Sequence, residues 1–287
     1  MLQDLAHNLI SSASGAISLS HHCGRPLNDT IDRLRSMCRQ MKDFKQEESL
    51  RGILPFFQIV LNLSGNCEEP SELEGEAMDM LIGVHSVAEK DSINGRLEYS
   101  ARLTLAVYFE KLDLAEYLLP LVAGKYQPAK AHYSAFQGAF ASGMANYGLF
   151  RKKGTAKFRR KAEARVKQMA KWVENGGVNC GPPLLIMRAE GMAIDGLPQE
   201  EVLAAFDKAA AAARSMKFLQ QEGIAYEMAA SYLFDKYHSP LFFQYAAKAL
   251  NIYNEWGAHA KIAFLEEKFN TSMESIMRRA TQPSPNQ

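Results

Sequence analysis

Residues 198–216 read PQEEVLAAFDKAAAAARSM, and residues 239–256 read SPLFFQYAAKALNIYNEW. Both stretches contain Ala, Leu, Gln, Glu and Lys, which lose little side-chain entropy when they enter a helix. Both also open with a helix-start signal, because Pro198 precedes acidic residues and Ser239 precedes a proline. The two stretches therefore predict two α-helices of similar design.

The two helices belong to a repeat with a period of 37 residues. The matched pairs are Glu190 with Glu227, Phe206 with Phe243, Ala209 with Ala246, and Ala210 with Ala247. Repeats of roughly 34 residues, each built as helix–turn–helix, are typical of TPR-like arrays. One pair of helices cannot bury its apolar face alone, so such pairs stack on their neighbours.

Small and aromatic side chains have complementary roles in the packing of these repeats. A small residue midway along a helix lets a neighbouring helix approach closely, and aromatic rings at three- and four-residue intervals fill the remaining space. The residues that we predict to pack the repeats together are Phe206, Ala209, Phe243, Ala246, Tyr253 and Trp256.

The same helical pattern continues along most of the chain, and strict alternation of apolar and polar residues never extends over enough residues to predict a sheet. The predicted helices are 2–20, 28–44, 47–63, 71–89, 93–110, 112–123, 129–150, 156–174, 183–195, 198–216, 219–236, 239–256 and 258–269. We therefore predict an all-α fold, a TPR-like α-solenoid of antiparallel helix pairs, over residues 1–270. Its best-defined repeats span 183–269, and residues 271–287 form a C-terminal extension with a disordered tail.

Composition and charge exclude several classes of protein. With 287 residues, of which 47% are hydrophobic, the chain is long enough for a sizeable core. Its net charge of +1 gives no overall reason to expect nucleic acid as a partner. There is no apolar run of about 18 residues, and the start of the chain lacks the pattern of a signal peptide. The cysteines are scattered, which favours reduced thiols and a cytoplasmic location: Cys23, Cys38, Cys67 and Cys180.

The sequence contains no motif of a recognised chemistry. Residues 152–155, KKGT, lack the glycine spacing of a phosphate-binding loop, and the kinase signatures are absent. Residues 21–23, HHC, point about 100° apart on a helix, so helix-end packing is favoured over metal binding. We predict no enzyme activity, no cofactor and no metal. A deep pocket lined by two or more strongly shifted titratable groups would favour an enzyme instead.

A strongly basic segment is the main electrostatic feature. Residues 151–171 carry ten basic residues against one acid, Glu163, for a local charge of +9. Apolar residues recur on the opposite side at helical spacing, which predicts an amphipathic helix with a cationic outer face. The candidate docking face consists of Arg151, Lys152, Lys153, Lys157, Arg159, Arg160, Lys161, Arg165, Lys167 and Lys171.

Three interpretations of this face remain open. The favoured one is a solvated surface that acids elsewhere in the fold balance. The second is a docking face for an acidic protein or for another domain of a parent protein. The third, nucleic acid or an anionic membrane, is disfavoured because one helix alone is basic and no row of aromatic residues accompanies it.

The C-terminal third resembles a known helical region. Residues 185–195, 217–235 and 244–265 look like the TPR-like region that follows the AAA-type ATPase domain in multidomain signalling kinases, including hybrid sensor histidine kinases. Softer similarities upstream extend the resemblance to residues 7–269. The motif Tyr-x-x-Trp-Gly-Ala-x-x-Lys, followed by a leucine, is matched here by Tyr253, Trp256, Gly257, Ala258, Lys261 and Leu265.

The resemblance implies a helical linker between an ATPase module and downstream sensor or kinase domains, with no catalytic residues. Because the ATPase and kinase parts are absent from this sequence, we expect a fragment or relic of a larger signal-transduction kinase. Its partners are then a protein or other domains of the parent. The alternative function is a free-standing TPR-type adaptor that binds an acidic protein or nucleic acid through the basic helix at 151–171.

Overall fold

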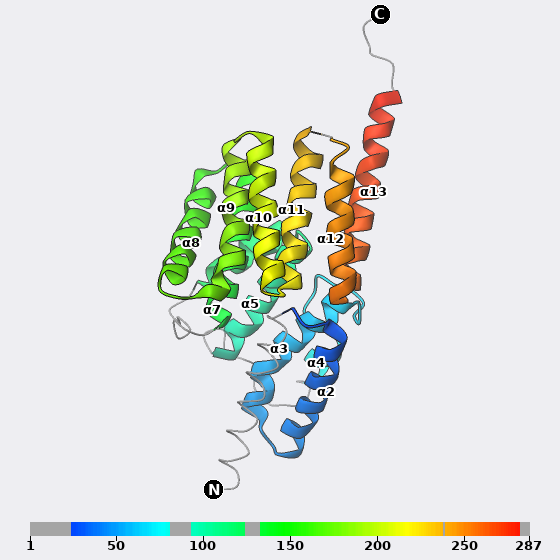
Figure 1. Ribbon diagram of the computed structural model, residues 1–287. Helices are drawn as coiled ribbons and strands as arrows, with labels where there is room; N and C mark the ends of the chain where they lie inside the picture. The colour runs from blue at the N-terminus through cyan, green and yellow to red at the C-terminus, as the bar shows by residue number, and fades with distance from the viewer. Residues whose placement is uncertain (1–23, 81–92, 124–132, 238, 282–287) are drawn as a thin grey trace, which may run out of the picture.

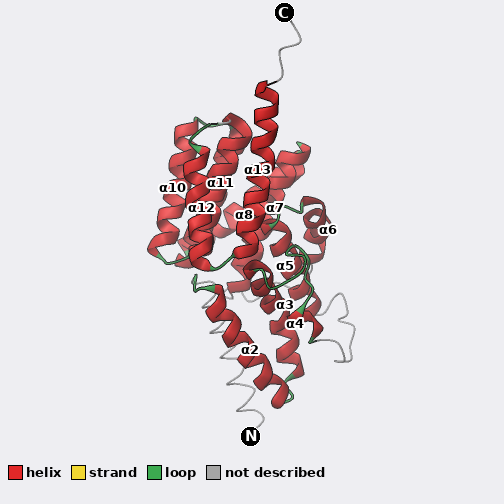
Figure 2. Cartoon of the chain, turned by 90° about the vertical axis from the view of Figure 1, so that its right-hand side faces the viewer, coloured by secondary structure: helices red, strands yellow, loops and turns green. Residues whose placement is uncertain are grey.

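A computed structural model describes residues 24–80, 93–123, 133–237 and 239–281 (Figure 1). Over these ranges the chain is helical and contains no strand, which confirms the all-α prediction (Figure 2). The predicted first helix at 2–20 and residues 21–23 lie outside the described residues.

The described residues form twelve α-helices and one short 3-10 helix. They are α2 (Leu27–Asp43), α3 (Glu47–Ser64), α4 (Glu76–Asp79), α5 (Ile93–Tyr108), α6 (Leu112–Val122), α7 (Tyr133–Lys153), α8 (Ala156–Glu174), η1 (Val178–Cys180), α9 (Gly181–Asp195), α10 (Gln199–Ser215), α11 (Leu219–Tyr237), α12 (Phe242–Trp256) and α13 (His259–Thr281).

Two predicted boundaries were wrong. Of the helix predicted at 71–89, residues 71–75 belong to a loop that begins at residue 65, the single turn of α4 follows, and residues 81–89 lie outside the described part of the chain. At the other end, α13 continues past the predicted helix limit of 269 to Thr281. Of the predicted disordered tail, residues 282–287 lie outside the described part of the chain.

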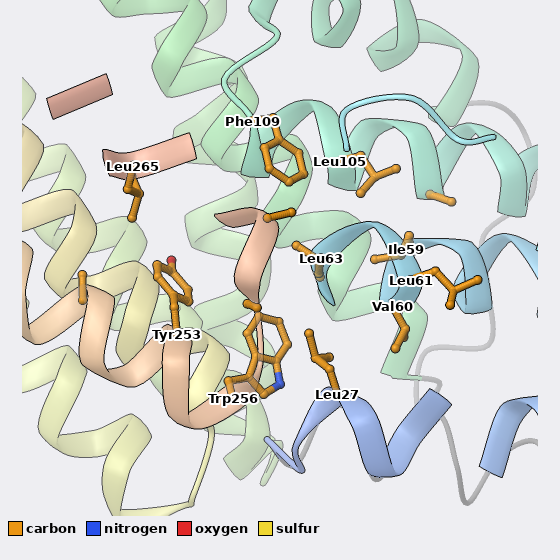
Figure 3. Packing of buried hydrophobic residues seen from close by; sticks show 14 of the residues in the cluster. Leu27, Ile59, Val60, Leu61, Leu63, Leu105, Phe109, Tyr253, Trp256 and Leu265 are labelled. Atoms are coloured by element: carbon orange, nitrogen blue, oxygen red, sulfur yellow. The ribbon is translucent and has the colours of Figure 1, made fainter. Parts of the chain in front are cut away.

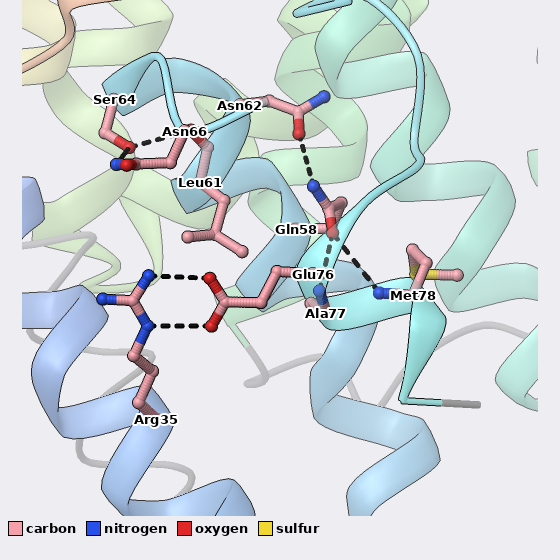
Figure 4. Close-up of polar contacts among 9 residues, drawn as sticks. All are labelled: Arg35, Gln58, Leu61, Asn62, Ser64, Asn66, Glu76, Ala77 and Met78. Carbon is pink, nitrogen blue, oxygen red and sulfur yellow. Dashed lines mark hydrogen bonds and ion pairs between the residues drawn. The ribbon is translucent and has the colours of Figure 1, made fainter. Parts of the chain in front are cut away.

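Buried amides explain why residues 65–75 do not continue as a helix. The Asn62 side chain donates to the backbone oxygen of Pro70 at 3.0 Å and to that of Glu72. The Gln58 side-chain oxygen accepts from the backbone nitrogens at 77 and 78, at 2.9 and 3.3 Å (Figure 4). These bonds satisfy backbone groups that would otherwise need a helical partner, so the loop is held in an irregular conformation.

An ion pair ties the same loop to the neighbouring helix. The Arg35 guanidinium on α2 donates to both carboxylate oxygens of Glu76, at 2.8 and 2.7 Å (Figure 4). This side-chain hydrogen bond, more than charge alone, lowers the pKa of Glu76. The bidentate geometry fixes the start of α4 against α2.

From α7 onward the helices form successive antiparallel hairpins. α7 packs on α8, α9 on α10, and α11 on α12, and the following helix α13 packs on α12 (Figure 1). Two of these helices, α9 and α12, end at a glycine in the left-handed conformation, Gly196 and Gly257, from which the turn to the next helix starts. These hairpins agree with the predicted antiparallel pairs.

The first helices of the described fold pack against its last helices, whereas in a linear stack of repeats each unit touches only its neighbours. The hairpin α2–α3 lies against α12 and α13, where a Cβ atom on Gly257 would stand 3.8 Å from Leu27. Trp256 is fully buried among Tyr253 from its own helix and Leu27 and Leu63 from the N-terminal hairpin (Figure 3). The largest buried ring therefore joins α12 to α2 and α3, the first two helices of the described fold.

Five of the six predicted packing residues are buried, and one is not. Those buried are Phe206, Ala209, Ala246, Tyr253 and Trp256. Phe243 is 53% exposed, whereas its neighbour Phe242 is 3% exposed and packs on Phe269 with ring centroids 4.8 Å apart. Phe206 is therefore matched in burial by Phe242, a shift of one residue from the 37-residue alignment. One residue rotates a helix by about 100°, which carries Phe243 into solvent.

Alanine substitutions at two helical glycines test this packing, because the expected changes in the free energy of unfolding have opposite signs. A Cβ atom on Gly223 in α11 would stand 2.6 Å from the Tyr253 ring, so Gly223→Ala should destabilise the fold by about 1–3 kcal/mol. A Cβ atom on Gly138 in α7 would meet nothing within 4 Å, so Gly138→Ala should stabilise by up to about 1 kcal/mol. Urea denaturation of both variants measures the difference. Equal effects would contradict the close approach of α11 and α12.

Candidate functional site

The ten predicted basic residues lie on two helices rather than one. Gly154, in the left-handed conformation at φ 65°, separates the end of α7 from the start of α8. Arg151, Lys152 and Lys153 occupy the last turn of α7, and the other seven lie along α8. The predicted continuous face is therefore divided at Gly154.

Four of the ten basic residues form ion pairs with acids. Lys152 reaches Asp113 on α6 at 2.7 Å, and Lys153 pairs with Glu116 on the same helix. Arg159 lies 2.9 Å from Glu163 and 2.6 Å from Asp195, and these contacts raise the pKa of its guanidinium. The fourth, Arg151, reaches Glu190 on α9 at 2.8 Å. These residues fit the favoured interpretation, in which acids elsewhere balance the basic segment.

The remaining basic residues of α8 have no acidic partner among the described residues. Arg165 donates to the side chain of Gln168 at 2.8 Å, and the Lys157 ammonium lies 4.7 Å from the centroid of the Phe158 ring. The exposed residues of this group are Lys157, Arg160, Lys161, Lys167 and Lys171. The side chains of Phe158, Ala162 and Met169 point the other way and are buried.

A cavity that the sequence did not reveal lies between α5, α7, α11 and α13. Its volume is about 380 Å³, which is within the usual range for a ligand-sized site. Its lining residues run along α7 from Gln137 to Lys152 and along α11 from Gln221 to Asp235, or about 21–23 Å of each helix. Much of the lining is apolar, formed chiefly by Val107, Phe140, Met144, Ile224 and Met228.

The same lining includes a buried ion-pair network centred on Glu227, which lies on α11 between Ile224 and Met228. The Lys261 ammonium, 1% exposed, donates to one oxygen of Glu227 at 2.8 Å and to the backbone oxygen of Tyr108. The Tyr253 hydroxyl donates to the other oxygen at 2.6 Å. Burial, together with the Glu227 charge, raises the pKa of both phenols, Tyr108 and Tyr253. The Glu227 carboxylate, the Lys261 ammonium and the Tyr253 hydroxyl are thus all hydrogen-bonded, as buried polar groups must be.

A second ion pair lies at the charged end of the cavity. The Lys268 ammonium donates to Glu110 at 2.5 Å and to the Ser231 hydroxyl at 3.1 Å. Desolvation alone would raise the pKa of Glu110, but the charges of Lys268, Lys261 and Arg151 outweigh it and lower that pKa. Together with Asp235, these residues make this end densely charged but nearly balanced.

Glu190, the repeat partner of Glu227, is completely buried beside this end of the cavity. Its contact with Arg151 is an ion pair without hydrogen-bond geometry, since neither carboxylate oxygen has a hydrogen-bond partner in the described part of the chain. Desolvation raises the pKa of Glu190, the Arg151 charge opposes this, and the Asp235 charge adds to it. Glu190 is therefore less well stabilised in its charged form than Glu227, which accepts two hydrogen bonds.

The raised pKa of Glu190 predicts a dependence of stability on pH. The folded protein holds this proton to a higher pH than the unfolded chain, so stability falls as pH rises from about the ordinary value of 4.5 towards the folded value. Glu190→Gln should remove this loss, because the amide stays neutral and water can solvate Arg151, which is 39% exposed. Melting temperatures at mildly acidic and mildly alkaline pH measure the effect. Equal pH dependence in both proteins would contradict it.

The shifted groups that line the cavity are not arranged for proton transfer. The pKa of Tyr108 moves up and that of Glu110 moves down, so each is held more firmly in the charge state that it has at neutral pH. General acid–base catalysis needs a pKa near the working pH. Among the described residues, no group of three or more His, Cys, Asp and Glu side chains could hold a metal ion.

One sequence signal pointed toward this site. The 37-residue repeat sets Glu190 on Glu227, and both prove to be buried carboxylates that face a cation on a neighbouring helix. Their cations come from positions far apart in the chain, Arg151 on α7 and Lys261 on α13. The repeated acid was therefore visible in the sequence, whereas its burial, its partners and the cavity were not.

No protein family, no curated protein and no solved structure matches this chain. None of the described helices is long and apolar enough to cross a membrane.

Proposed function

We propose that this chain is a non-catalytic, TPR-like interaction module that binds an extended segment of a partner polypeptide in the cavity between α5, α7, α11 and α13. The observation that carries the proposal is the cavity itself, whose lining combines apolar side chains with paired charges. The lining residues are spread over about 21 Å of α11, which matches the length of roughly six extended residues. The apolar residues suit the side chains of a peptide, and the nearly balanced charges suit its backbone better than a strongly charged ligand.

An interaction role is favoured over an enzyme by the state of the titratable groups. Glu110, Glu227, Lys261 and Lys268 each have a fixed partner of opposite charge. A catalytic acid or base needs a free position for the substrate proton. The cavity therefore supports binding better than reaction.

We further propose that the module serves a larger, ATPase-containing signal-transduction kinase. The support is the resemblance of residues 253–265 to the helical region of such kinases. The residues of that motif line or support the cavity wall: Tyr253 and Lys261 hold Glu227, and Gly257 ends α12 in the left-handed conformation. Changes at the cavity would then reach the α12–α13 junction directly.

We place this function in the cytoplasm. Cys38, Cys67 and Cys180 are free thiols, as is common in reducing compartments. Burial raises the pKa of Cys38 to about 11, which keeps this thiol protonated and unreactive.

Selection from a displayed library of random peptides, about twelve residues long, tests the proposal. The wild-type protein should enrich a peptide family that a cavity-filled variant, Val107→Phe with Ile224→Phe, does not retain. A matched control, Leu250→Phe, adds a ring at a half-buried site on α12 outside the cavity and should retain the peptides. Circular dichroism melts confirm that all three proteins are folded.

Two outcomes would count against the proposal. The first is no peptide family enriched above the background of bare support. The second is equal retention of the enriched peptides by the cavity-filled variant and the wild-type protein, which would place binding elsewhere.

A further inference from the structure

We infer that the outer face of α8 is a second docking surface, which binds an acidic polypeptide segment. This face consists of Lys157, Arg160, Lys161, Lys167 and Lys171. The inference is independent of the cavity, because none of these residues lines it.

The five cations lie on one side of the helix. Their positions relative to Lys157 are +3, +4, +10 and +14, which at 100° per residue keeps them within roughly a third of the circumference. From Lys157 to Lys171 the face is about 21 Å long. The buried stripe of Phe158, Ala162 and Met169 points to the opposite side, where α8 packs on α7 and α9.

The pairing pattern separates this face from the rest of the basic segment. Arg151, Lys152, Lys153 and Arg159 are all neutralised by acids of α6, α8 and α9. The five outer cations have no such acid among the described residues, although the chain has nearly as many acids as bases overall. The internal balancing that explains the first group therefore does not extend to the second.

Like charges at this spacing repel one another. Lys157 with Lys161, and Lys167 with Lys171, are four residues apart, and like-charge pairs at this distance destabilise a helix. Acidic side chains of a partner would remove this repulsion and add attraction between complementary surfaces. A straight row of cations on an edge helix is complementary to a helix or extended segment with carboxylates at similar intervals.

The face fits an acidic polypeptide better than nucleic acid. Proteins that bind single strands offer a series of exposed rings on which bases stack, and here the single half-buried ring of Trp172 borders the cations. A duplex requires a surface that follows its grooves and backbone over a larger area than one helix face provides.

Fluorescence anisotropy with a labelled, glutamate-rich helical peptide of roughly 20 residues tests the inference. The full chain should bind this peptide at low ionic strength, and binding should weaken steeply as salt is added. Combined substitution of Arg160→Gln, Lys161→Gln, Lys167→Gln and Lys171→Gln should weaken binding about tenfold or more. The control variant carries Arg33→Gln, Lys42→Gln, Lys45→Gln and Lys208→Gln, which remove the same charge from exposed sites elsewhere, and should stay within about twofold.

The outcomes are separable from those of the cavity experiment. The variant with Val107→Phe and Ile224→Phe should bind the acidic peptide as the wild-type protein does. Absence of peptide binding at low salt, or an equal loss in the control variant, would overturn the inference. Tighter binding of a short DNA duplex or of phosphatidylserine vesicles than of the peptide would also overturn it, in favour of nucleic acid or an anionic membrane.

Discussion

Glu227→Ala should destabilise the protein by about 3–5 kcal/mol, one of the two largest effects that we expect from a single substitution. The substitution removes the acceptor for both Lys261 and the Tyr253 hydroxyl. Lys261 is 1% exposed, so its charge would remain buried, with the backbone oxygen of Tyr108 as its hydrogen-bond acceptor and no carboxylate to neutralise it. Leaving one member of a buried pair alone costs the full desolvation energy of that charge.

Urea denaturation of Glu227→Ala measures this loss, and a second variant shows its cause. Glu227→Leu, Lys261→Met and Tyr253→Phe together remove every side-chain charge and hydroxyl of the network while keeping its volume. Replacement of a whole buried pair by apolar residues is often nearly neutral. The triple variant should therefore be more stable than Glu227→Ala. A triple variant that is less stable than the single one would show that the pairing itself, rather than the stranded lysine, sets the stability.

Phe206→Ala should cost about 3–5 kcal/mol, whereas Phe243→Ala should change the stability by no more than about 0.5 kcal/mol. The 37-residue repeat matches these two phenylalanines, but Phe206 is completely buried and Phe243 is 53% exposed. Removing a buried ring leaves a cavity that the neighbouring side chains fill only in part. The exposed ring loses little, because water already contacts it.

Phe242→Ala completes this comparison. Phe242 is 3% exposed and contacts the rings of Phe234 and Phe269, so its removal should cost about as much as that of Phe206. Thermal or urea denaturation of the three variants is sufficient. A larger loss of stability for Phe243→Ala than for Phe242→Ala would support the predicted alignment of Phe206 with Phe243 and contradict the burial of Phe242.

Most helices were predictable because their signals are local. Ala-rich stretches, proline and acidic residues at helix starts, and glycines at helix ends act within a few residues of one another. α10 and α11 accordingly lie within a residue or two of their predicted ranges. Residues 71–75 were wrongly predicted to be helical because Gln58 and Asn62, on the preceding helix, supply hydrogen bonds to the backbone at Glu72 and Ala77. Those hydrogen-bond partners cannot be predicted from the residues of the loop itself.

The candidate docking face was likewise predictable in part from the sequence. The excess of basic residues at 151–171 and their position opposite an apolar stripe were visible in the sequence. Which of them are neutralised was not, because their partners Asp113, Glu116, Glu190 and Asp195 lie on other helices. The structure thereby reduced a face of ten basic residues to one of five.

The sequence by itself determined that this chain is helical, where most of its helices begin and end, and that Glu190 and Glu227 occupy matching positions of a repeat. Only the tertiary structure decided that the N-terminal hairpin packs on α12 and α13, that Phe242 rather than Phe243 is buried, and that a cavity lies between α5, α7, α11 and α13. The physical reason is the distance along the chain over which each interaction acts. Helix propensity and capping act between residues close in the chain, whereas burial, ion pairing and cavities depend on side chains that come together only when distant helices pack, as Lys261 does with Tyr108.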